Sequence, residues 1–417
     1  MASILLSFVG NQDPFSGTTE KLGSIVTLLR ELVARQIEIK KVVLLYTTGT
    51  QKGAKETLDW IASEADLKQF EVELIPTSAA LSEDPTDLLA AALEARRGLE
   101  IVKAQLKRGD FIEFNASSGT PAMKAALSML QAAGYATQGR VWQVRNPKEM
   151  QPGQERVYET DVTVLRQEFD RQKLRQLVEE YNYSGALDLV EQSDLLIDES
   201  AIALLKAGKI WNQGQFDAFY EKAKFKLDNA QKNQTKTYWW QAYEQGYTAV
   251  VRLKQGNSTE AMLHSFRAVE GLLYQWVLEH FSQHLQNEKK ASDYKLVKIS
   301  ISQKYPSLRD DFDGEDEKKL NRWMMIKIFK AFDTTACNNP DFQGWCNAND
   351  DRNELSHHLG GISEQELYGA WRVKNAEQWE ARLLACLNLL TEQKFDKFMN
   401  GALLPVIHHH LLKALTP

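Results

Sequence analysis

Apolar and polar residues alternate in blocks over the first 160 residues of this chain. Short apolar runs are typical of buried strands, and five such runs lie at 4–9, 41–46, 70–75, 111–114 and 140–144. Segments with apolar residues at helical spacing separate them, at 18–36, 54–64, 84–107 and 121–133. This alternation predicts right-handed β-α-β units and a doubly wound, parallel, Rossmann-like sheet. The run at 70–75 alternates enough with polar residues to be an edge strand.

The pattern changes after Thr163, where we find no convincing strand and helical spacing dominates. Residues 235–254 are rich in aromatic side chains, which we assign to a core rather than to a surface that stacks bases. The helix expected at 259–286 has one apolar face, made by Leu263, Phe266, Val269, Leu273, Trp276 and Val277. The chain therefore combines an α/β first domain with an all-α remainder.

Composition narrows the class of protein. The 417 residues are 43% apolar and carry a net charge of −6, which suits a soluble protein and argues against one that wraps a long duplex. The three cysteines, Cys337, Cys346 and Cys386, lack metal-ligand spacing, so we expect a reducing compartment and no metal site. We expect no signal peptide and no membrane span, because the first residues lack a basic region and no run approaches 18 apolar residues. We therefore expect the protein to be cytoplasmic.

Polar loops follow three of the expected strands, at the edge where ligands bind in such sheets. The loops contain Asn11, Gln12 and Asp13, then Thr48 and Thr50, then Asn115, Ser117, Ser118, Gly119 and Thr120. Hydroxyl and backbone N–H groups at a helix start bind phosphate without a metal. Helix capping also uses such residues, but one cap needs one of them and the third loop offers four. No dinucleotide-binding Gly-x-Gly-x-x-Gly and no P-loop occurs.

A second candidate site is the stretch Arg352-Asn353-Glu354-Leu355-Ser356-His357-His358. The Asn and Asp residues at 347–351 predict that a helix begins just before it, which places Arg352 near a helix N-terminus. A guanidinium and backbone N–H groups at such a position suit a phosphate. On one straight helix Arg352 and His357 diverge by about 140°. The alternative is therefore a solvated helix with an ion pair and two surface histidines.

Together these features resemble one family, the CARF–HEPN ribonucleases of type III CRISPR systems, and the Csm-type ancillary nucleases in particular. The resemblance rests on Asn-x-Ser-Ser-Gly-Thr-Pro at 115–121 and on Arg-Asn-x-x-x-His at 352–357, and it spans the whole chain. It implies a CARF sensor domain at 1–160, a helical connector at 161–255 and a helical HEPN nuclease domain at 256–417.

The resemblance implies that the first domain binds a cyclic oligoadenylate across the interface of a homodimer. The matching loop carries over as Asn115, Ser117, Ser118, Gly119 and Thr120, whereas Asn11, Gln12, Asp13, Thr48 and Thr50 are placed by topology alone. The Ser-Ser-Gly-Thr-Pro form favours cyclic hexa-adenylate over cyclic tetra-adenylate as the activator. Some relatives also cleave their ring slowly, so a ring nuclease activity is implied as well. No cofactor is implied.

By the same resemblance, catalysis falls to Arg352 and His357, with Asn353 beside them, where two protomers meet. The spacing between arginine and histidine in the family's motif also allows His358 as the catalytic histidine, and we favour His357. The chemistry is consistent, because RNA supplies its own 2′-hydroxyl nucleophile, histidine transfers protons near neutral pH and arginine stabilises a phosphorane.

We therefore expect a metal-independent endoribonuclease of antiviral defence that acts on single-stranded RNA and not on DNA. Its products would carry 2′,3′-cyclic phosphate and 5′-hydroxyl ends. The alternative is a non-catalytic nucleotide sensor that signals through its helical half.

Overall fold

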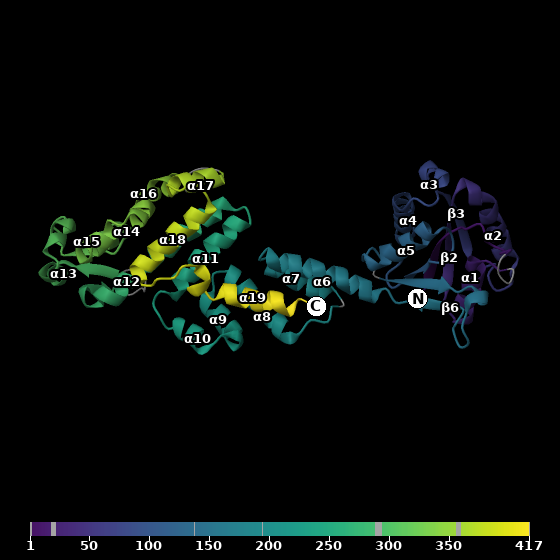
Figure 1. Ribbon diagram of the computed structural model, residues 1–417, viewed down its shortest axis with the longest axis horizontal. Helices are drawn as coiled ribbons and strands as arrows, with labels where there is room; N and C mark the ends of the chain where they lie inside the picture. The colour runs from purple at the N-terminus through teal and green to yellow at the C-terminus, as the bar shows by residue number, and fades with distance from the viewer. Residues whose placement is uncertain are drawn as a thin grey trace. The chain divides into compact units, whose positions relative to one another are not determined.

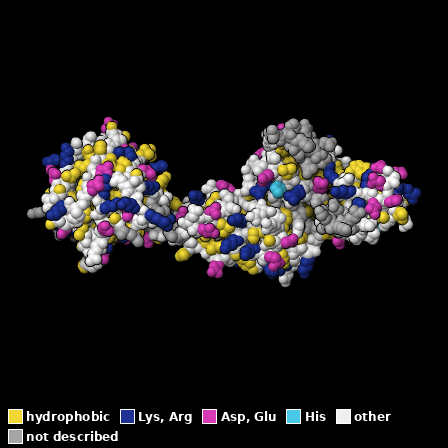
Figure 2. Space-filling view, turned by 180° about the vertical axis from the view of Figure 1, so that it is seen from behind, with side chains coloured by type: hydrophobic (Ala, Val, Ile, Leu, Met, Phe, Trp, Pro, Cys, Tyr) yellow, Lys and Arg dark blue, Asp and Glu magenta, His cyan; other side chains and the backbone are white. Residues whose placement is uncertain are grey.

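The computed structural model describes residues 2–17, 22–136, 138–193, 195–287, 294–355 and 360–416, and the side chains of all of these except 287 and 349–355. The chain divides into two units, Met1–Asp170 and Arg171–Pro417 (Figure 1). Basic and acidic side chains lie interspersed over the face of each unit that Figure 2 shows. None of the helices in the described ranges has the length and apolarity needed to span a bilayer.

The first unit is built on a six-stranded sheet of order β3-β2-β1-β4-β5-β6. Its strands are β1 (Ser3–Phe8), β2 (Ile39–Tyr46), β3 (Glu71–Pro76), β4 (Phe111–Asn115), β5 (Gly139–Val144) and β6 (Val157–Thr160). The first five pair in parallel, as predicted, and β3 is an edge strand. The sixth strand was missed: β6 pairs antiparallel with β5. It is only four residues long and half polar, so it carries little of the apolar signal that marks a buried strand.

Helices cover both faces of this sheet. One face packs against α1 (Ser24–Ala34) and α2 (Gln51–Ser63), and the other against α3 (Ala79–Glu83), α4 (Leu88–Lys103) and α5 (Pro121–Ala132). Because side chains alternate along a strand, Leu6 of β1 faces the α4–α5 side and Leu5 faces the α1–α2 side. Each such fully buried side chain contributes about 1.5–3 kcal/mol. The predicted fold class is confirmed, although α1 begins later and α4 ends earlier than the sequence indicated.

The second unit is mainly helical and has one continuous hydrophobic core that runs from Leu174 to Leu415. Its helices are α6 (Thr163–Glu179), α7 (Tyr183–Gln192), α8 (Glu199–Asn212), α9 (Phe216–Ala223), α10 (Asn229–Gln234), α11 (Trp240–Lys254), α12 (Ser258–Phe281), α13 (Lys298–Lys304), α14 (Arg322–Phe332), α15 (Thr334–Cys337), α16 (Pro340–Leu355), α17 (Glu364–Ala370), α18 (Ala376–Thr391) and α19 (Leu404–Ala414). The aromatic side chains of α11 belong to this core, as predicted. On α12 the predicted apolar face is buried except for Leu263, which is exposed. The boundary at residue 255 stays a prediction, because the core continues across it.

A small antiparallel sheet corrects the expectation of no strand after Thr163. It consists of β7 (Leu285–Asn287), β8 (Tyr294–Val297) and β9 (Glu317–Lys319), in that order. These strands are only three or four residues long. They therefore lack the alternating apolar pattern by which longer strands are found.

His408 on α19 lies in the core of the second unit. Its Nδ1 is 2.9 Å from the Tyr183 hydroxyl, and its ring stacks on Tyr181 with centroids 4.4 Å apart. Burial lowers the pKa of His408 from 6.5 to about 4; Lys254 lowers it further and Glu179 opposes the shift. The folded chain therefore holds this histidine neutral.

We expect this histidine to make the protein sensitive to acid. The unfolded chain binds a proton at His408 more tightly than the folded chain does, so stability falls as the pH drops from about 6.5 towards about 4. The loss through this group should reach roughly 2–3 kcal/mol. Urea unfolding at pH 7 and pH 4.5 should show a smaller loss for His408→Phe than for the wild type, and an unchanged loss for the exposed His409→Phe. Equal losses in all three proteins would contradict this.

Candidate functional site

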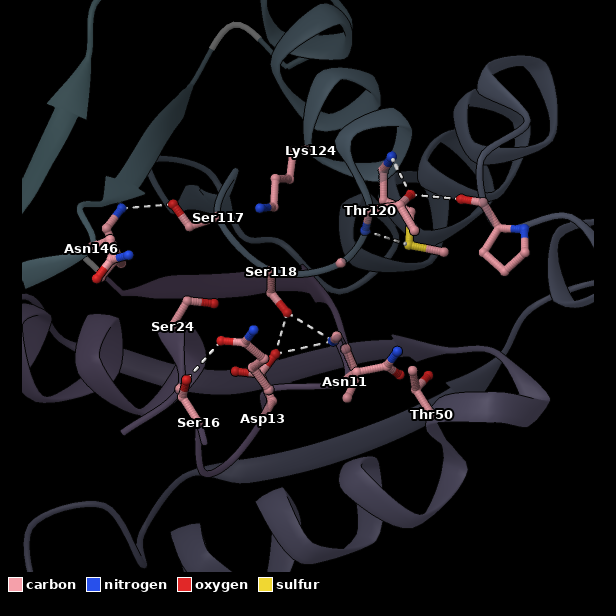
Figure 3. Close-up of a pocket in the computed structure, with 18 of the residues that line it drawn as sticks. Asn11, Asp13, Ser16, Ser24, Thr50, Ser117, Ser118, Thr120, Lys124 and Asn146 are labelled. Carbon is pink, nitrogen blue, oxygen red and sulfur yellow. Dashed lines mark hydrogen bonds between the residues drawn. The ribbon is translucent and has the colours of Figure 1, made fainter. Parts of the chain in front are cut away.

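A cavity of about 520 Å³ opens at the carboxyl ends of the parallel strands in the first unit. The chain runs from β1 to β2 and β3 on one side and returns to β4 and β5 on the other, so the strand order reverses between β1 and β4. Ligands bind at this point in open α/β sheets. The loops after β1, β2, β4 and β5 line the cavity together with the start of α5 (Figure 3).

Asp13 ties the cavity floor together. Its carboxylate accepts hydrogen bonds from the N–H of Gly10 at 3.0 Å, the N–H of Ile25 at 3.2 Å and the hydroxyl of Ser118. The residue is only 6% exposed. Burial raises the pKa of its carboxyl, while the donors from Ser118, Gly10 and Ile25 oppose that shift. One side chain thus joins the loop after β1, the loop after β4 and the first turn of α1.

Two glycines let these loops approach each other. A Cβ at Gly10 would lie 2.8 Å from the backbone nitrogen of Gly119, and a Cβ at Gly119 would lie 2.8 Å from Met123 Sδ. Gly119 also has a φ of +88°, a conformation that side chains disfavour. The Gly10 N–H donates to Ser118 Oγ at 2.9 Å as well. Glycine at both positions is therefore a requirement of this close crossing.

Hydroxyl groups from two loops, those after β4 and β2, order the cavity wall. Ser117 Oγ accepts from the N–H of Val144 at 2.6 Å, which ties the β4 loop to the end of β5. Thr120 caps α5 and donates its hydroxyl to the carbonyl of Pro85 at 2.6 Å. Thr50 Oγ1 accepts from the N–H of Thr47 at 3.0 Å. These contacts fix the loops in the shape that a ligand would meet.

The structure brings eight of the ten residues predicted for ligand binding to this cavity: Asn11, Gln12, Asp13, Thr50, Ser117, Ser118, Gly119 and Thr120. The other two lie outside its lining. Asn115 is fully buried, donates to Ser7 Oγ at 3.0 Å and accepts from the N–H of Ser117 at 3.1 Å. Thr48 is exposed, and its N–H donates to Ser82 Oγ at 3.2 Å. Asn115 therefore acts on the cavity only through Ser117.

Three cations in the lining were missed from the sequence. Lys124 extends from the first turn of α5 into the cavity (Figure 3), and Arg145 and Arg156 come from the ends of β5 and β6. The Arg145 guanidinium stacks 3.6 Å from the centre of the Tyr158 ring and donates to the carbonyl of Glu155 at 2.6 Å. With Asp13 these are the charged residues among the described lining, so positive charge predominates. Ligands bind at the carboxyl ends of parallel strands, and this rule, which predicted the loops after β1, β2 and β4, also applies to the loop after β5.

The helix position predicted for Arg352 is wrong. Residues 340–355 form one helix, α16, which begins at Pro340 and not at 347–351. The backbone of Arg352 therefore lies twelve residues after the start of α16, away from the free N–H groups that a helix N-terminus offers to an anion. Proline is common at the first position of a helix, so Pro340 indicated the true start of α16. The Asn and Asp residues at 347–351 favoured a later start instead. His357 and His358 lie outside the described residues. In the described ranges no group of three His, Cys, Asp or Glu side chains could hold a metal ion.

Residues 162–209, which include α6, α7 and most of α8, match the family model of the CRISPR-associated protein Csm6 6H domain. Csm6 from Enterococcus italicus, solved with cyclic hexa-2′-fluoro-hexa-dAMP, is similar in structure over 99% of this chain and 100% of its own. The TM-score is 0.70 at 16% sequence identity. Residues 162–209 are thus similar to the Csm6 6H domain, and the chain shares the fold of Csm6 from Enterococcus italicus.

Other comparisons add little to the Csm6 match. Can2 from Sulfobacillus thermosulfidooxidans, in complex with cyclic tetra-adenylate, aligns over 70% of this chain and 72% of its own, at 11% identity and a TM-score of 0.23. That score is too low to indicate a shared fold. No curated protein matches the sequence. The similarity to Csm6 thus rests on the segment at 162–209 and on the fold of the whole chain.

Proposed function

We propose that this protein is a cyclic-oligoadenylate-activated, metal-independent endoribonuclease of type III CRISPR defence. The observation that carries the proposal is the cavity at the strand-order reversal, with three cations in its lining, in a chain of Csm6 fold. A phosphodiester ring is polar and anionic, and this cavity presents ammonium, guanidinium and hydroxyl groups to it. In this proposal the ring binds the first unit, and Arg352, Asn353 and His357 cleave RNA.

The size of the cavity supports a ring shared between two copies. A space of about 520 Å³ lies within the range of single small-molecule sites, whereas a ring of six nucleotides is several times larger than such ligands. We therefore propose a homodimer in which two cavities hold opposite parts of one ring. Cyclic hexa-adenylate is the activator we favour over cyclic tetra-adenylate.

The proposed chemistry needs only groups of the chain and of the substrate. The 2′-hydroxyl of RNA attacks the adjacent phosphorus and forms a bond to it, and the bond from phosphorus to the 5′-oxygen breaks. His357 moves protons between these two oxygens, and Arg352 stabilises the negative charge of the phosphorane. The products have a 2′,3′-cyclic phosphate and a 5′-hydroxyl.

The test is an RNA digest in EDTA with saturating ring. Cleavage to the two stated ends, with no cleavage of the matching DNA, is the expected result. A metal requirement, or 5′-phosphate ends, would reject the mechanism. Tight ring binding without any cleavage would favour a non-catalytic sensor.

Lys124 provides a prediction for the binding step. Lys124→Gln should weaken ring binding about tenfold without changing thermal stability, because it removes a cation from the cavity and touches no core. Calorimetric titration of the full chain with cyclic hexa-adenylate would measure this. The exposed Lys68→Gln serves as the control and should bind as the wild type does. Identical affinities for all three proteins would remove Lys124 from the site.

The same cavity would carry any ring nuclease activity. The ordered loops could align a ring 2′-hydroxyl with the adjacent phosphorus, so slow self-limiting cleavage of the ring belongs to the proposal. Labelled ring incubated with His357→Ala should then be degraded. A ring that stays intact over many hours would reject this part alone.

A further inference from the structure

Trp323 is a large aromatic side chain that the core of the second unit leaves at the surface. It stands in the first turn of α14, where its neighbours Met324 and Met325 are buried, yet it is 47% exposed. Exposing an indole to water is unfavourable, whereas burying it in a packed position would be favourable. The helix therefore turns one aromatic face outward while its other side holds the core.

Two ammonium groups lie beside this indole. Lys318 Nζ on β9 is 5.5 Å and Lys327 Nζ on α14 is 4.9 Å from the Trp323 ring centroid. Asp313 and Asp311 hold these lysines: Lys318 pairs with Asp313, and Lys327 lies 3.4 Å from Asp311. The acidic partners hold both ammonium groups beside the exposed ring.

The segment around Trp323 has a positive net charge, although the net charge of the whole protein is negative. Residues 294–330 carry nine lysines and arginines and six acidic residues, a net charge of +3, whereas the whole chain has −6. An ordered, exposed aromatic ring with cations at its rim is the arrangement that stacks the unpaired bases of single-stranded nucleic acid. Long-range attraction by the segment would bring a polyanion to the ring.

The position of α14 links this surface to the proposed catalytic turn. Arg322, next to Trp323, donates to the carbonyl of Cys346 on α16 at 3.2 Å and stacks 4.5 Å from the Trp345 ring. The backbone of Arg352 follows Cys346 by six residues on the same helix, about 9 Å along its axis. Arg322 thus joins the start of α14 to the part of α16 that precedes the backbone of Arg352.

We propose that Trp323, with Lys318 and Lys327, is a base-stacking platform that binds single-stranded RNA substrate beside the nuclease site. This rests on the proposed ribonuclease function for its biological role. The binding step itself does not depend on which residues cleave. The platform supplies affinity and not chemistry, so its loss raises KM and leaves kcat unchanged.

The experiment measures binding of a fluorescent single-stranded RNA whose 2′-hydroxyls are all methylated, so that no cleavage can occur. Full-length wild type, Trp323→Ala and Trp323→Phe are titrated by anisotropy, with and without saturating cyclic hexa-adenylate. The control is Phe225→Ala, because Phe225 is also an exposed ring (51%) with a lysine, Lys226, 5.7 Å from its centroid.

We expect Trp323→Ala to weaken binding about tenfold, since a stacked base contributes about that much. Trp323→Phe should recover most of the affinity, and Phe225→Ala should bind as the wild type does. Lys327→Gln should reduce the slope of log K against log salt by about 0.7. Double-stranded RNA of the same sequence should not respond to Trp323→Ala, because its bases are already stacked.

Wild-type affinity in Trp323→Ala, or no RNA binding by the wild type, would overturn the platform. In that case the surface around Trp323 would instead be a candidate binding site for a partner of another class, such as a peptide. If RNA binds at Trp323 but unmodified RNA is never cleaved, the platform stands and the proposed nuclease function fails. The two failures are thereby separate.

Discussion

Alanine at Arg352 or at His357 is expected to abolish RNA cleavage in the presence of ring, with a loss of about 10³-fold or more in kcat. Removing the histidine takes away proton transfer, which contributes about 10²–10⁴-fold. Removing the guanidinium takes away stabilisation of the phosphorane, which is of similar size. Cleavage of a labelled single-stranded RNA in EDTA measures both variants.

Matched controls separate catalysis from charge and folding. His409→Ala changes an exposed histidine of α19 and Arg108→Ala an exposed arginine of the first unit, and both should cleave at the wild-type rate. His358→Ala should retain most activity if His357 is the catalytic residue. Full activity in His357→Ala together with loss in His358→Ala would shift the register by one residue. Full activity in Arg352→Ala would exclude this stretch as the active site.

Alanine at Asp13 should have the largest effect on the sensing unit. It leaves the N–H groups of Gly10 and Ile25 and the hydroxyl of Ser118 without their buried acceptor. Each unsatisfied buried donor costs about 1–3 kcal/mol, so the first unit should lose about 3–5 kcal/mol. The loops after β1 and β4 would separate, and ring binding should weaken about 100-fold or more.

Asp13→Asn distinguishes a positioning role from direct ligand contact. The amide keeps one acceptor but turns an N–H₂ group towards donors, so both stability and ring affinity should fall, and fall together. Differential scanning calorimetry and calorimetric titration measure the two. The exposed Asp59→Asn of α2 should change neither. Lost ring affinity at unchanged stability would instead show that Asp13 contacts the ring itself.

The parallel sheet could be predicted because burial on both faces leaves long apolar runs. β1 is fully buried and reads as a continuous run, and the two cores take alternate residues from it. β6 and the short strands β7 to β9 could not be found in this way. Each has three or four residues and a half-wet face, so packing of the finished fold, rather than local pattern, holds them in place.

The cavity could be predicted only where its lining residues lie in loops that follow parallel strands. The topological rule placed Asp13 and Ser118 near one another, but it could not predict that the Asp13 carboxylate also bonds to Gly10, Ile25 and Ser118 of the chain. Lys124 was missed because it stands on a helix and not in a loop. The start of α16 was misplaced because Asn and Asp, which are good caps, occur in the middle of that helix.

The central claim is that a ring bound in the first unit controls RNA cleavage in the second. It is tested most directly by the initial rate of RNA cleavage in EDTA as each ring of three to six adenylates is titrated. We expect negligible cleavage without ring, and saturable activation by one ring size, most strongly by cyclic hexa-adenylate. A rate that is the same with every ring as with none would contradict it.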